Sequence, residues 1–170
     1  MHPEVRTLVE AWHWMYFETD LMFEGLRPEN LHRRPASNLL SISEHCAHLV
    51  RSEASIVNRY LFGQLEAEWA DTPMRKRLFG WPPTMLESPV DSELLRMSIH
   101  EVRAALLAEH DRCYDLAQKL ELPAEHVFDD DWARCPTVGD RLKIAAYHVG
   151  YHMGQIYTVR HLLGEETPEN

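Results

Sequence analysis

A chain of 170 residues with a formal net charge of −10 suits one compact domain over residues 1–170. Its acidic surface would repel nucleic acid, because nucleic-acid affinity depends largely on Lys and Arg side chains. The apolar runs are short and interrupted by charge, which argues against a membrane span. Without the basic start and apolar stretch of a signal peptide, the chain is expected in the cytoplasm, with its three cysteines reduced.

The first half of the chain contains two segments with helical periodicity. The first predicted helix runs from about Pro3, which suits a first helical turn, to Gly25, which suits a C-terminal stop. The second begins near Ser41, where Ser-Ile-Ser-Glu fits a capping box, and runs to about Phe62 or Gly63.

The second half contains two further helical segments between irregular stretches. Residues 64–90 hold several prolines, and we expect a long crossover there that forms part of the lining of a site. The third predicted helix spans about Asp91 to Leu120, and the fourth spans Thr137 to Leu163. Four long helices with long crossover connections indicate an all-α fold of the four-helix-bundle class.

The sharpest local pattern is the pair His148 and His152 within AAYHVGYHMGQIYTVRHLLG (145–164). On a helix, residues four apart lie about 40° apart around the axis and about 6 Å apart along it. Two imidazoles so placed can converge on one cation at about 2.1 Å each. The same helix carries apolar residues at helical spacing, which turn the pair toward the bundle interior: Ala145, Val149, Ile156, Val159 and Leu163.

A third metal ligand must come from another helix, and the second helix offers His45 and His48. Periodicity does not choose between them, although the apolar stripe of this helix lies somewhat nearer His45. That stripe is formed by Ile42, Leu49, Ile56 and Tyr60.

Glu53 falls inside this apolar stripe, where a carboxylate is costly unless it is paired. It could orient a metal-binding histidine, ligate the metal or act as a base. The alternative is a salt bridge across the bundle to Arg141 or Arg160. Gln155, three residues beyond His152, is a second candidate for contacting a bound ligand or a neighbouring group.

Two segments together resemble a known family. ENLHRRPASNLLSISEHCAHLVRSE (29–53) and YHVGYHMGQIYTVRHLLG (147–164) are similar to the DinB-like superfamily, also called DinB/YfiT-like metalloenzymes. The resemblance rests on an Arg-Pro loop, a Ser-Ile helix start, Ala-His-Leu around His48, and His-x-x-x-His followed by Gly-Gln. It implies a four-helix bundle with His48, His148 and His152 as metal ligands. His45 has no counterpart in the family pattern, so it is expected behind the ligands or at the surface.

The resemblance also implies a function. Three protein ligands leave a coordination position for water or substrate, and imidazole suits Zn or Ni, with Fe, Mn or Cu as further candidates. Bacterial thiol S-transferases and a thiol-dependent maleylpyruvate isomerase resemble this chain. They imply an enzyme that uses a low-molecular-weight thiol to attack a small electrophilic substrate. The alternatives are a metal-dependent hydrolase and a non-catalytic metal-binding stress protein.

Several other residues carry simpler expectations. Cys46 is expected as a small core residue, and Asp129–Asp131 as a solvated loop. A homodimer is expected, with a face supplied by Trp12, Trp14 or Phe23. Four histidines are expected mainly at the surface: His13, His100, His110 and His161.

Overall fold

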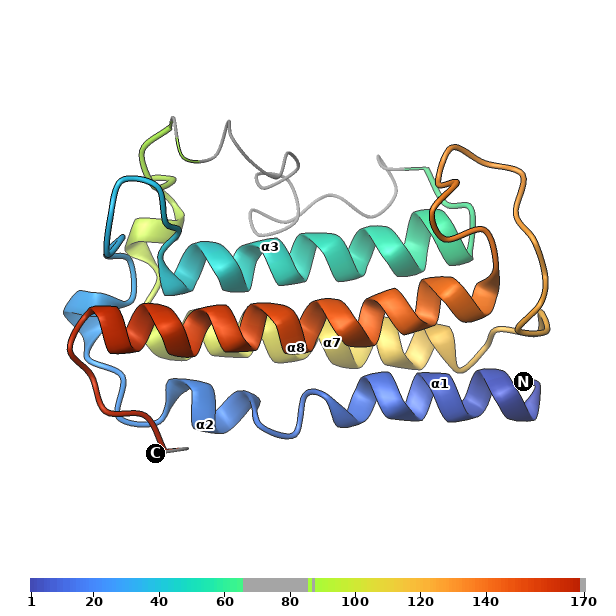
Figure 1. The fold of residues 1–170 in the computed structure, drawn as a ribbon, viewed down its shortest axis with the longest axis horizontal. Helices are drawn as coiled ribbons and strands as arrows, with labels where there is room; N and C mark the ends of the chain where they lie inside the picture. Colours follow the sequence, from blue (N-terminus) through green and yellow to red (C-terminus); the bar gives the residue numbers. More distant parts are fainter. Residues whose placement is uncertain (66–85, 87, 169–170) are drawn as a thin grey trace.

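The computed structural model describes residues 1–65, 86 and 88–168. Its four long helices are α1 (Pro3–Trp14), α3 (Ile42–Ala54), α7 (Ile99–Ala117) and α8 (Val138–Leu162). They lie side by side, with α1 and α8 running one way and α3 and α7 the other (Figure 1). The described residues contain no strand, and the predicted all-α class is confirmed. Shorter elements are α2 (Thr19–Phe23), η1 (Pro28–Asn30), η2 (Ser55–Leu61) and η3 (Leu94–Arg96).

Side-chain caps fix the starts of the two helices that carry the histidines. At α3 the Ser41 hydroxyl accepts from the Glu44 N–H at 3.3 Å, and the Ser41 N–H donates to the Glu44 carboxylate at 2.9 Å. This is the capping box that the sequence predicts. At α8 the Thr137 hydroxyl accepts from the Asp140 N–H at 3.1 Å. Both helices therefore begin where their sequences indicate.

The prediction of one continuous helix from Pro3 to Gly25 is wrong, because the chain turns after Trp14 and resumes as α2. No Pro or Gly marks this break. The turn brings the Tyr16 side chain into the core, where its hydroxyl donates to Glu53 at 2.5 Å. Gly25 does follow the second piece, with a left-handed φ of 66° that suits glycine.

The third predicted helix begins later than expected. Asp91 does not start it; its carboxylate instead accepts from the N–H groups of Glu93 and Leu94 in the turn before η3. The long helix α7 starts after Ser98, whose hydroxyl forms a capping box with Glu101. Asp91 and Ser98 are both residue types that cap helices, and the sequence alone favoured the earlier one as the start of the long helix.

The predicted crossover at 64–90 falls mostly outside the described residues, and so does its expected part in lining the site. The described part does place the start of α7 beside the start of α3. His32 joins them, with Nδ1 2.9 Å from the Ser43 hydroxyl and Nε2 2.9 Å from the Met97 carbonyl oxygen.

The core occupies the space between the four helices, and α3 is its most enclosed element. Every residue of α3 except Ser52 is buried, so this helix has no exposed face that would reveal its orientation. Cys46 is a core residue, as predicted. Two of the residues expected at a dimer face, Trp12 and Phe23, are buried instead, whereas Trp14 is exposed.

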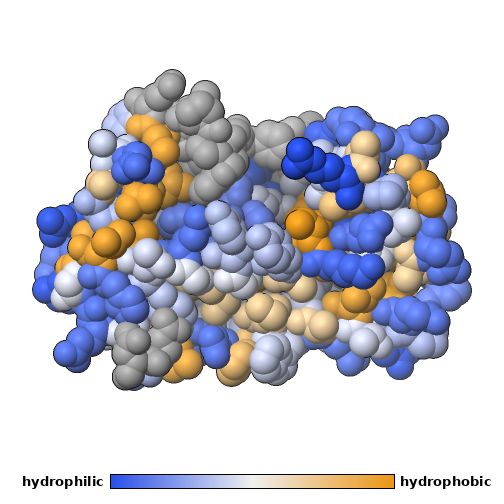
Figure 2. Space-filling model, in the orientation of Figure 1, coloured by the Kyte–Doolittle hydropathy of each residue, from blue (hydrophilic) through white to orange (hydrophobic). Residues whose placement is uncertain are grey.

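The surface seen in Figure 2 carries hydrophobic residues in separate patches among hydrophilic ones. Of the helices in the described part of the chain, none has the length and apolar character needed to cross a membrane.

Candidate metal centre

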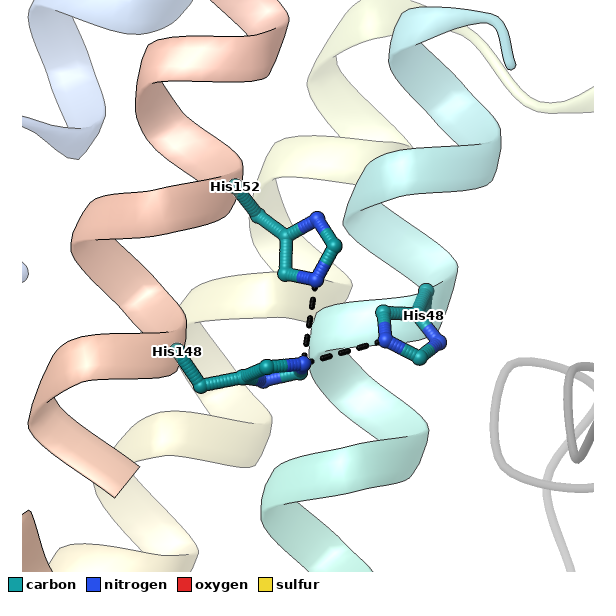
Figure 3. Close-up of side chains that lie close together, drawn as sticks. All are labelled: His48, His148 and His152. Carbon is teal, nitrogen blue, oxygen red and sulfur yellow. Dashed lines mark hydrogen bonds between the residues drawn. The ribbon is translucent and has the colours of Figure 1, made fainter. Parts of the chain in front are cut away.

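Three histidines from two helices meet between α3 and α8. Figure 3 shows the rings of His148 and His152, both on α8, directed toward the ring of His48 on α3. The Nε2 atom of His148 lies 3.1 Å from Nε2 of His48 and 3.0 Å from Nε2 of His152. One nitrogen from each ring lies within 4.8 Å of the other two. The two histidines of α8 and His48 of α3 thus converge at one point.

The donor set fits a divalent metal. Two imidazole nitrogens bound to one tetrahedral ion at about 2.1 Å lie roughly 3.4 Å apart. The two close contacts are a few tenths of an ångström shorter, so small rotations of the rings suffice to admit an ion. Among the described residues, no fourth His, Cys, Asp or Glu joins the group. Three nitrogen donors without a fourth protein donor correspond to a site with an open coordination position.

The surroundings keep His148 and His152 neutral, which is the form that binds metal. Burial lowers the pKa of His148 to about 4. Burial lowers the pKa of His152 to about 2, and repulsion from a positive charge on His148, His48 or His45 acts in the same direction. Protons therefore compete weakly for these nitrogens at neutral pH.

His45 lies behind the cluster and not at the surface. It is 4% exposed, and its Nδ1 lies 3.3 Å from Nδ1 of His152. If His152 presents Nε2 to a metal, its proton resides on Nδ1 and can be donated to His45. This contact fixes the ring orientation and tautomer of His152, which is the usual role of a residue behind a metal ligand.

Glu53 takes part in a separate cluster. Its carboxylate accepts from the Tyr16 hydroxyl at 2.5 Å and lies 2.7 Å from Nδ1 of His110. Nε2 of His110 in turn lies 2.8 Å from Nδ1 of the exposed His13. The alternative of an ion pair between Glu53 and Arg141 or Arg160 is wrong. Those two arginines pair with Asp130 and Glu165.

The expectation of a surface position for His110 is also wrong, because it is 1% exposed. A signal for this was present in the sequence. His110 shares a helical stripe with Leu106, Cys113 and Ala117, all of which are buried. The phase of that stripe would have placed the imidazole in the core, opposite the equally buried carboxylate of Glu53.

Two pockets have a histidine of this region in their walls, His45 in one and His148 in the other. One, of about 240 Å³, is lined by His45 and Gln155 together with mainly apolar side chains that include Leu40 and Val159. The Gln155 amide donates to the Tyr151 hydroxyl at 3.1 Å. The other pocket, of about 210 Å³, has His148 in its wall. One of the three candidate ligands, His148, thus borders an open pocket.

A helical bundle with three convergent imidazoles from two helices defines a class of protein that could bind one divalent metal. A family model described as the DinB superfamily matches residues 11–156. The chain belongs to the DinB superfamily. No curated protein and no solved structure matches it.

Proposed function

We propose that the protein is a metal-dependent enzyme in which His48, His148 and His152 hold one divalent ion. The observation that carries this proposal is the approach of the three Nε2 atoms to one another without a fourth donor from the described residues. Imidazole donors suit Zn, Ni, Cu or Fe, and we propose Zn or Ni as the ion. A closed structural site would have four protein ligands.

We further propose that the reaction is a thiol-dependent transfer to a small electrophilic molecule. A divalent ion held by three imidazoles supplies a Lewis acid that lowers the pKa of a thiol or a water molecule at its remaining position. The chain's own residues would do the rest. His45 orients His152, and the pocket lined by His148 offers a place for a reactant beside the ion.

Metal content tests the ligand assignment. We expect about one equivalent of metal in the wild-type protein by elemental analysis, and a large loss in His48→Ala, His148→Ala and His152→Ala. His100→Ala is the matched control, because His100 is an exposed histidine distant in sequence from the cluster. Unchanged metal content in the three cluster variants would refute the assignment.

Activity separates the transferase from the hydrolase alternative, which would use the same three histidines. Zinc-loaded and nickel-loaded protein would be incubated with 1-chloro-2,4-dinitrobenzene and a panel of low-molecular-weight thiols, and separately with an activated ester in the absence of thiol. The transferase predicts turnover that requires both metal and thiol. Ester hydrolysis without any thiol would favour the hydrolase, and no turnover of either kind would favour a non-catalytic metal-binding protein.

A further inference from the structure

The pocket beside His148 has a composition that identifies the kind of molecule it would accept. Its wall contains Ile56 and Tyr60 from η2, Trp132 from the loop before α8, and Ile144 from α8. The remaining lining residues are Ser52, Ser55 and His148. The lining of the pocket thus contains a candidate metal ligand, His148, and its other side chains are mainly aromatic and aliphatic.

The aromatic wall is held in place by Arg141. Its guanidinium is fully buried, donates to the Cys135 carbonyl oxygen at 2.9 Å and pairs with Asp130 at 2.6 Å. It also donates to the Tyr60 carbonyl oxygen and lies 5.6 Å from the ring centroids of both Tyr60 and Trp132. Arg141 therefore links the loop that carries Trp132 to η2, so the wall exists before any ligand binds.

Two serine hydroxyls supply the polar groups of the pocket. The Ser52 hydroxyl lies 3.4 Å from Nε2 of His48, the nitrogen proposed to bind metal. Ser55 is 4% exposed, and its hydroxyl has no hydrogen-bond partner among the described residues. A buried hydroxyl without a partner costs free energy, and a ligand that bonds to it removes that cost. Ser55 also begins the π-helix Ser55–Leu61, a geometry found frequently at functional sites.

Charge narrows the choice of ligand. No Asp, Glu, Lys or Arg of the described residues lines this pocket. Two arginines beside the aromatic wall pair with carboxylates, Arg59 with Asp131 at 3.1 Å and Arg141 with Asp130. In the metal-free protein, an ionised ligand would lose hydration here without gaining an opposite charge from the described lining residues.

We infer that this pocket binds an uncharged aromatic molecule carrying a hydrogen-bond acceptor such as a carbonyl oxygen. The aromatic ring packs between Ile144 and the wall formed by Tyr60 and Trp132. The acceptor receives a hydrogen bond from the Ser55 hydroxyl. Resting on the proposed function, this inference assigns the electrophilic substrate to the pocket beside His148.

Benzamide is a suitable probe, with benzoate as its charged counterpart. Each would be titrated into the full-length protein, metal-free and zinc-loaded, while the indole N–H signal of Trp132 is followed by NMR after assignment with Trp132→Phe. In metal-free protein we expect a saturable shift with benzamide and at least about ten-fold weaker binding of benzoate. Ser55→Ala should weaken benzamide binding about five-fold, which corresponds to one hydrogen bond.

Two further variants locate the binding. Ile144→Trp fills the pocket and should abolish the shift, whereas Leu39→Ala, in the pocket beside His45, should leave benzamide binding unchanged. The inference is overturned if benzamide gives no saturable shift, if benzoate binds equally well, or if Ser55→Ala binds as tightly as wild type. Failure of the three histidines to hold metal would leave the metal-free titration intact, so the two proposals fail separately.

Discussion

Three buried histidines at this site, His45, His148 and His152, are individually poor bases in this fold, because burial penalises their charged forms. The pKa values of His45 and His148 are lowered to about 4, and that of His152 to about 2. When the chain unfolds, each group returns to an ordinary pKa near 6.5. The unfolded chain then binds protons that the folded, metal-free protein does not bind.

The metal-free protein should therefore lose stability as the pH falls from about 6.5 toward 4, and keep this contribution at higher pH. Each such histidine contributes at most about 1.4 kcal/mol per pH unit within that window. Urea unfolding between pH 7.5 and 5 in the presence of a chelator measures the slope. His148→Gln should reduce this slope by the contribution of about one bound proton. An equal slope in the variant would contradict the lowered pKa assigned to His148.

His45 should act on the metal through His152. We expect His45→Ala to weaken metal affinity about 10- to 100-fold while leaving the stoichiometry at one, because the His152 ring loses the group that orients it. His45→Gln retains an acceptor for the His152 proton and should recover much of the loss. Competition with a coloured chelator measures both affinities. Equal metal affinity for His45→Ala and wild type would show that His45 does not support metal binding.

The cluster around Glu53 should matter for stability and not for metal binding. Burial raises the pKa of this carboxyl, while the bonds from His110 and Tyr16 favour its ionised form. Tyr16→Phe removes one of these bonds and should cost about 2 kcal/mol of unfolding free energy. Metal content should stay at the wild-type level in this variant. A loss of metal with unchanged stability would reassign the cluster to the metal centre.

At the scale of elements, the start of α7 depends on Ser98. Its hydroxyl accepts from the Glu101 N–H at 3.3 Å, and the Glu101 carboxylate receives the Ser98 N–H at 2.7 Å. Ser98→Ala should cost about 1 kcal/mol of unfolding free energy. Ser92→Ala, at the earlier start that the sequence suggested, should change it by only a few tenths of a kcal/mol. The two variants can be compared by chemical denaturation, and equal costs would contradict the observed helix boundary.

The long helices also explain how the site is built from so few residues. One turn of α8 fixes the spacing of His148 and His152, and α3 supplies His48 from the facing helix. The ion would thus link α3 to α8, which are far apart in sequence.

At the scale of the whole molecule, metal should therefore stabilise the bundle. A free metal concentration 100-fold above the dissociation constant would add about 2.7 kcal/mol. For a domain of this size, that corresponds to a rise in Tm of roughly 5 to 10 °C. Thermal unfolding with zinc and with a chelator measures the difference. His48→Ala should lose the shift and His100→Ala should keep it; a metal-dependent shift that persists in His48→Ala would place the ion elsewhere.

The sequence by itself determined the elements that depend on local chemistry. The capping box at Ser41, the start of α8 at Thr137 and the inward stripe containing His152 follow from propensity and periodicity, which neighbouring residues largely set. The resemblance to the DinB superfamily then identified His48 as the third candidate metal ligand.

Only the tertiary structure decided which side chains meet across helices. It placed His45 behind His152, paired Glu53 with Tyr16 and His110, and broke the first helix so that Tyr16 could reach the core. These outcomes depend on the rotation and axial offset of one helix against another. Because α3 is buried on nearly every side, its apolar pattern contains no exposed face from which that rotation could be derived.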